Sequence, residues 1–413
     1  MKNLLFLVIL SIQTFVFAQE KKDFVRSSLH MHLVDDFDFE NGDYLLKSYN
    51  KFQFPENYND HTIDLRKVKL SEYELTDEEK ENAGKKDNLL GNVSSEIVEE
   101  STGGLMKIQD NSMVKLQLDK YISENKIPQK LIKKWWNIDS EGSFNTDLAS
   151  NRSLQSQTTE MAALAKSSGT GTVDQFNKLI NNTFIVFTRL FFVSNEVAAE
   201  VTRQVAYNEA NKLSSLASDL AKKAADKVYE KTSEGYSVWS TSWLYQLDWN
   251  SETFDLFTST ISDGKIDLEK LESIDFKLNF LSQEKASSLV TFSLKKEDKD
   301  RTDQDVFDLS TLRNMDKVLV KLQKENDVFK PIFPLKEGFS MAAGTKEGIE
   351  GGETFEVLET KNGEYHRIGT MKVDKDKVWN NSWTSEEIET GLTYFKKGSN
   401  KYVPGVHYVR LVK

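Results

Sequence analysis

The spacing of apolar residues changes along this chain of 413 residues, and the change constrains what it can fold into. Residues 172–234 contain no Gly or Pro, and apolar residues such as Leu213, Leu216 and Leu220 recur there at steps of three and four. That spacing is typical of a long helix. From residue 336 onward apolar and polar residues alternate, which is typical of half-buried strands joined by tight turns.

Strands and helices alternate in the middle of the chain. The apolar segment 183–193 predicts a strand that is covered on both faces, and Ser194 or Asn195 could cap the helix after it. A later helix is expected to begin near Ser310 or Thr311. Further strands are expected over 113–118, 236–249 and 288–294. We therefore expect an α+β or α/β fold, in which a mixed sheet-plus-helix domain precedes a small C-terminal β-barrel.

The expected organisation has five segments. They are a signal peptide over 1–18, a mixed and partly irregular region over 19–160, an α/β domain with a long Ala-rich helix over 161–327, a Pro-containing linker over 328–335, and the small barrel over 336–413.

The first residues predict export. A short basic start precedes an apolar run over 4–10, and Ala18 ends a stretch that suits signal-peptide cleavage. An uncleaved N-terminal anchor is the alternative. The later apolar segment 184–193 is too short to span a bilayer and contains Arg189. We expect no transmembrane span after cleavage, and a periplasmic, outer-membrane-associated or extracellular protein.

Composition excludes several chemistries. The chain has 54 Lys and Arg against 65 Asp and Glu, which gives a net charge of −11. An acidic chain repels phosphate backbones, so broad nucleic-acid binding is not expected. Because there is no Cys, disulfides, thiolate nucleophiles and Cys-ligated metals are absent. No cofactor is expected.

Two short motifs near the C-terminus resemble a known module. Residues 348–357 are Gly-Ile-Glu-Gly-Gly-Glu-Thr-Phe-Glu-Val, and residues 367–373 are Arg-Ile-Gly-Thr-Met-Lys-Val. Together they resemble an SH3-like β-module of envelope proteins such as the flagellar-motor H-ring assembly family. The preceding stretch is similar to periplasmic domains of curli-secretion-type proteins. The whole chain resembles uncharacterised secreted proteins of Bacteroidota, through 243–247 and 316–322. The resemblance implies an envelope scaffold or binding role.

His30 and His32 are the pair that most suggests chemistry. A spacing of two on a strand places both rings on one face, as in many metal sites. Asp35 and Asp36 follow and could supply oxygen ligands. Residues 29–35 also resemble the first metal motif of amidohydrolases, which needs further His and Asp ligands on later strands. A metal-dependent hydrolase acting through His30 and His32 is therefore the alternative hypothesis, and a solvent-facing strand pair is the competing interpretation.

Five tryptophans are the candidate binding residues. Trp239, Trp243 and Trp249 are separated by even numbers of residues, so they share one face of an extended strand. Such a face could stack sugars or dock a partner, or it could simply fill a sheet core. Trp135 and Trp136 are adjacent, so one of them is expected to be exposed. The leading hypothesis is a non-catalytic envelope protein that acts as a scaffold or binding module for a protein partner or a glycan.

Overall fold

The structure is a computed structural model of the chain. It describes residues 26–36, 42–82, 111–155, 177–292, 301–361, 364–383, 391–396 and 398–412. The expected signal peptide over 1–18 lies outside the described residues.

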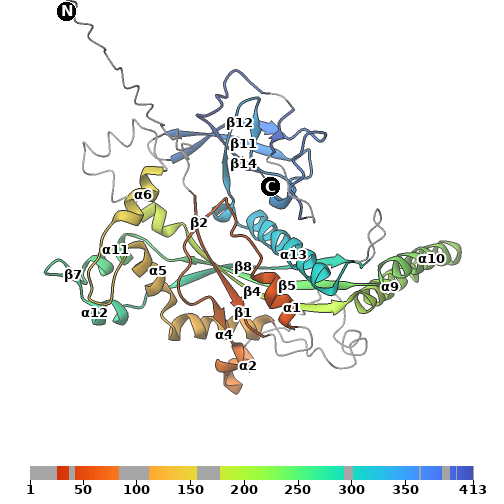
Figure 1. Cartoon of the computed structure of the whole chain (residues 1–413), viewed down its shortest axis with the longest axis horizontal. Helices are drawn as coiled ribbons and strands as arrows, with labels where there is room; N and C mark the ends of the chain where they lie inside the picture. The colour runs from red at the N-terminus through yellow and green to blue at the C-terminus, as the bar shows by residue number, and fades with distance from the viewer. Residues whose placement is uncertain are drawn as a thin grey trace, which may run out of the picture.

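A six-stranded mixed sheet forms the centre of the molecule, in the order β2-β1-β4-β5-β8 with β3 also beside β1 (Figure 1). β1 is parallel to β2, β3 and β4, whereas β5 runs antiparallel to both of its neighbours, β4 and β8. The strands are β1 (Ser28–Val34), β2 (Asn59–Asp60), β3 (Lys67–Val68), β4 (Thr183–Ser194), β5 (Tyr236–Leu247) and β8 (Leu278–Val290). The expected strands over 183–193 and 236–249 are confirmed as β4 and β5.

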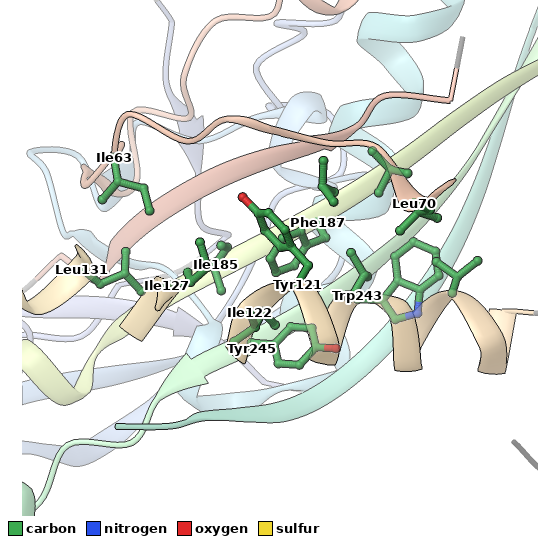
Figure 2. Close-up of a cluster of buried hydrophobic side chains, with 14 residues drawn as sticks. Ile63, Leu70, Tyr121, Ile122, Ile127, Leu131, Ile185, Phe187, Trp243 and Tyr245 are labelled. Carbon is green, nitrogen blue, oxygen red and sulfur yellow. The ribbon is translucent and has the colours of Figure 1, made fainter. Parts of the chain in front are cut away.

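Helices cover both faces of this sheet, because successive side chains of a strand point to opposite faces. α1 (Gly42–Tyr49) and α13 (Asp303–Glu325) pack on the face that carries Leu29, Val186 and Leu244. α4 (Asn111–Glu124) and α5 (Ile127–Trp135) pack on the opposite face against Ile185 and Trp243, as Figure 2 shows. The expected mixed α/β architecture is confirmed.

Smaller elements surround the two layers. They are η1 (Leu70–Glu72), α2 (Asp77–Asn82), α6 (Asp147–Gln155), α11 (Ser251–Thr258), β6 (Ile261–Ser262), β7 (Lys265–Ile266), α12 (Leu268–Ser273) and η2 (Asp327–Phe329). Beyond the end of β5, α11 and α12 enclose a second core with α5. None of the described helices combines the length and the apolar character that crossing a bilayer requires.

A pair of helices leaves the sheet between β4 and β5. α9 (Asn195–Ala210) and α10 (Ser215–Thr232) pack on each other and extend to one side of the molecule (Figure 1). The helical spacing over this segment is confirmed, but the chain turns back at 211–214 and makes two helices. Leu216 on the outer face of α10 is 74% exposed, so this stripe of leucines does not pack on the sheet.

Asn195 fixes the base of this helix pair. Its side-chain amide donates to the carbonyl oxygens of Glu234, at 2.8 Å, and Val290, at 3.0 Å. The Ser237 hydroxyl donates to Asn195 Oδ1 at 2.8 Å. The side chain thus joins the start of α9 to the start of β5 and the end of β8, instead of capping the helix.

Replacing Asn195 with Ala is expected to lower the free energy of unfolding by about 2 kcal/mol, because buried carbonyl groups and the Ser237 hydroxyl lose their partner. Urea denaturation at neutral pH measures this change. Asn208→Ala on exposed α9 surface is the matched control and should stay within about 0.5 kcal/mol of the wild type. Equal stability of the two variants would contradict a stabilising role for the Asn195 hydrogen bonds.

The C-terminal module consists of two small antiparallel sheets. One has four strands in the order β12-β11-β14-β9 and the other pairs β10 with β13. The elements are β9 (Ile332–Pro334), β10 (Ser340–Met341), η3 (Thr345–Glu347), β11 (Thr354–Lys361), β12 (Glu364–Lys372), β13 (Thr393–Tyr394) and β14 (Tyr408–Leu411). The expected barrel is wrong in one respect: over the described residues these sheets do not close. The expected linker supplies β9, an edge strand, and Pro334 ends it.

Three expected elements change. The predicted strand over 113–118 is wrong, because this segment lies inside α4. The predicted strand over 288–294 overlaps only the end of β8. α13 begins after Thr302, whose hydroxyl accepts from the Asp305 backbone N–H, so the helix starts two turns before Ser310.

Candidate ligand-binding cleft

His30 and His32 point to the face of the sheet that α4 and α5 cover, and both are 0% exposed. The interpretation as a solvent-facing pair is therefore wrong. His30 Nε2 lies 3.2 Å from His32 Nδ1, and the His32 ring contacts Tyr121 and Phe187. Burial lowers the pKa of His30 to about 4 and the pKa of His32 to about 3, with repulsion between the two rings adding to the second shift. Both imidazoles are thus neutral at neutral pH.

A third buried histidine belongs to a neighbouring network. His61 Nε2 donates to the Leu131 carbonyl at 2.9 Å, so its Nδ1 accepts from Arg152 at 2.9 Å. Arg152 also donates to the Ser28 hydroxyl at 3.0 Å and lies 4.7 Å over the Trp135 ring. This network joins α6 to β1 and β2, and it occupies both ring nitrogens of His61.

The acidic residues after β1 are also engaged. Asp36 pairs with Arg189 at 3.1 Å, and Asp35 lies 3.7 Å from Lys67. Among the described residues, no group of three or more His, Asp or Glu is placed to hold a metal ion. The geometry does not favour a metal centre at this pair of histidines.

The predicted tryptophan surface lies mostly inside the protein. Trp243 is fully buried between β5 and α4, and Trp239 is half-buried on the same face. Trp249 follows β5 and donates from Nε1 to Asn177 in the second core. Trp135, the last residue of α5, and Trp136, which caps the helix, are both buried in the second core, where Trp135 lies beside His61 and Trp136 stacks on Phe257. The expectation that one of this pair is exposed is wrong.

An open cleft of about 570 Å³ separates the central domain from the C-terminal module. One wall is α13 with the end of β8, and the other wall comes from η3 and the segment that ends at Trp383. Sites of this size often lie where two domains meet. Five cations and two carboxylates line it: Arg313, Lys317, Lys321, Lys324, Lys346, Asp316 and Glu350.

Four of these cations form one stripe along α13, because their spacings of four, four and three residues keep them on one helix face. Lys317 Nζ donates to the Ser287 carbonyl at 3.1 Å, and Lys321 Nζ donates to the Lys285 carbonyl at 2.6 Å. Both acceptors belong to β8, the last strand of the sheet. An ammonium has three N–H donors, so further donors remain for a ligand. Burial lowers the pKa of Lys317, and repulsion from Arg313 and Lys321 lowers it further.

Asp316 is the unusual group of the cleft. Burial raises its pKa to about 7, although the Lys346 ammonium and the indole N–H of Trp383 act against this shift. Lys346 Nζ lies 3.3 Å from the centre of the Trp383 ring, and Arg313 donates to the Trp383 carbonyl at 3.0 Å. These contacts hold the Trp383 segment against α13. Asp316 therefore changes its charge near neutral pH inside a cationic surface.

A glycine brings the two walls together. Gly348 has φ +74°, and a Cβ atom there would lie 2.5 Å from Val320 Cγ1 on α13. Both the left-handed backbone and the lack of space require Gly at this position.

The sequence did not predict this cleft, although it contains a signal for one of its walls. The basic spacing along the helix over 303–325 could have indicated a cationic face. No sequence signal placed Lys346 and Trp383 opposite that face. Comparison with protein-family models, with curated proteins and with solved structures finds no match to this chain.

Proposed function

We propose that this protein is a non-catalytic binding protein of the cell envelope, which holds an anionic ligand between α13 and the C-terminal module. One observation supports this above all: five cations against two carboxylates line a cleft of about 570 Å³ in a chain of net charge −11. Such a local reversal of charge attracts anions. Ligands with two or more carboxylate or phosphate groups match the length of the lysine stripe.

The envelope location is part of the proposal. It rests on the signal peptide expected over 1–18 and on the resemblance of 348–357 and 367–373 to SH3-like envelope modules. A metal-dependent hydrolase is less well supported, because His30 and His32 are sealed under α4 and α5, where no substrate reaches them. The anionic ligand would come from an envelope partner, either an acidic protein segment or an acidic glycan.

Neutralising the stripe is expected to weaken anion binding. Lys317→Gln with Lys321→Gln removes two positive charges and keeps hydrogen-bond donors for the β8 carbonyls. Isothermal titration with citrate and with pyrophosphate should show binding that is about tenfold weaker, since each charge contributes up to about 1 kcal/mol. Lys223→Gln with Lys227→Gln on exposed α10 makes the same change in net charge and should leave binding unaltered. Equal losses in both variants, or no binding to the wild type, would refute the proposal.

A further inference from the structure

A second, smaller pocket lies on the opposite side of the sheet edge from this cleft, where α4, the start of α5 and the start of β8 meet. Its volume is about 330 Å³, at the small end of ligand sites. Its lining combines aromatic rings with amide, hydroxyl and carboxylate groups. No residue of the pocket belongs to the anion cleft.

One residue of the pocket lining carries a buried polar atom without a partner. Gln129 is 2% exposed, and its Nε2 donates to the Ile274 carbonyl at 2.7 Å. This bond fixes the amide, so Oε1 points the other way, and Oε1 has no hydrogen-bond partner among the described residues. A buried carbonyl oxygen that lacks a donor costs free energy. A ligand hydroxyl group would supply that donor if the amide turned toward the pocket.

The two aspartates of the pocket each pair with a lysine, and Lys126 adds a third lysine to its lining. Lys115 donates to Asp119 Oδ2 at 2.6 Å, and the Tyr245 hydroxyl donates to Asp119 Oδ1 at 2.8 Å. Lys277 lies 3.6 Å from Asp275. At both ion pairs a charged ligand would meet a cation and an anion together, which favours an uncharged polar ligand there.

An aromatic ring forms one rim. Phe280 is 39% exposed, packs edge-on against Tyr245 at 5.4 Å, and carries Lys115 Nζ 4.8 Å from its ring centre. The strand pair β5–β8 has a bulge at Leu244/Tyr245, which turns Phe280 toward this rim. An exposed ring beside fixed acceptors and donors suits a ligand that has both C–H faces and hydroxyl groups.

We propose that this pocket binds a neutral sugar, as a monosaccharide or as the end of a glycan. Its hydroxyl groups would donate to Gln129 Oε1 and to the Asp119 carboxylate, and accept from Asn279 and Ser123. Its C–H face would lie on Phe280. The glycan hypothesis thus moves from the buried tryptophans to this rim. This site is independent of the anion cleft.

Saturation-transfer NMR of the full chain with uncharged methyl glycosides tests the proposal, with galacturonate and glucosamine as charged comparisons. We expect transfer from at least one methyl glycoside, and affinity about tenfold lower in Phe280→Ala, because the ring contact is lost. Gln129→Met should give a similar loss. Leu289→Ala, at the far end of β8 and also exposed, should bind like the wild type.

The outcomes separate the two sites. Lys317→Gln with Lys321→Gln should lose citrate binding and keep glycoside binding, whereas Phe280→Ala should do the reverse. If Gln129→Met does not fold, Asn279→Ala, an exposed substitution, replaces it. The proposal is overturned if no methyl glycoside binds at millimolar concentration, if the charged sugars bind better, or if Phe280→Ala and Leu289→Ala behave alike.

Discussion

Acidification from pH 7 to pH 4 is expected to lower the free energy of unfolding by several kcal/mol. Burial lowers the pKa of His30 to about 4, of His32 to about 3, and of His61 well below its ordinary value of 6.5. The unfolded chain therefore takes up protons below pH 6.5 that the folded chain excludes. Each imidazole contributes stability that is fully present above pH 6.5 and is lost as the pH falls toward 4, at about 1.4 kcal/mol per pH unit.

The environment of each ring explains why protonation is so unfavourable. His30 also faces the positive charges of Lys134 and Arg66, which outweigh the attraction of Asp60. His61 accepts a hydrogen bond from the Arg152 guanidinium, so a second proton on this ring would point at a cation. The acid-sensitive part of the protein is therefore the layer between the sheet and α4, α5 and α6.

One substitution isolates a single ring. In His61→Gln, the amide can donate to the Leu131 carbonyl and accept from Arg152, while the titrating group is gone. Urea denaturation at a series of pH values should show a shallower loss of stability, by about 1.4 kcal/mol per pH unit below pH 6.5. His366→Gln removes an exposed imidazole on β12 and should reproduce the wild-type profile. Parallel profiles for wild type and His61→Gln would contradict the assignment.

The residue pattern of the sequence correctly predicted several of the long strands and helices. β4 came from a continuous apolar run, β5 from a segment rich in aromatic and β-branched residues, and α13 from apolar residues at helical spacing, and only the ends of these elements differ from expectation. The prediction failed at 113–118, where Val114, Leu116 and Leu118 alternate over too short a window. In α4 it is Val114, Leu118 and Tyr121 that pack on the sheet, at helical spacing.

The sites depend on contacts that no local pattern contains. Alternation correctly placed His30 and His32 on one face, but the helices that bury this face follow about eighty residues later. The sequence also predicted tryptophans that share a strand face, but it did not show that α4 and α5 would bury them. Gln129 and Phe280 belong to different elements, and only the bulge in β5–β8 and the bend before α5 bring them to one pocket.

Replacing Asp316 with Asn is expected to raise the free energy of unfolding by up to about 4 kcal/mol at pH 8. Burial raises the pKa of Asp316 to about 7 from 3.8, so the folded chain keeps a proton that the unfolded chain releases. The resulting loss of stability grows as the pH rises from 3.8 and is complete above pH 7. A neutral amide avoids it, whereas near pH 4 the two proteins should be almost equally stable. As the pH falls from 7 to 4, the wild type gains stability from Asp316 while it loses stability from the histidines. In Asp316→Asn the gain is absent, so its free energy of unfolding should fall more steeply on acidification.

A second carboxylate on the same helix provides the control. Asp308 accepts from the Ser48 hydroxyl at 2.8 Å and from Gln304 at 2.7 Å, and it pairs with Lys51. Asp308→Asn should therefore lower the free energy of unfolding by about 1 kcal/mol, the reverse of the Asp316 variant. Asp316→Asn should also tighten citrate binding at pH 8, since the ionised carboxylate repels an anion in the cleft. Unchanged stability at pH 8 would show that burial does not raise the pKa of Asp316, and unchanged citrate affinity would show that Asp316 does not face the ligand.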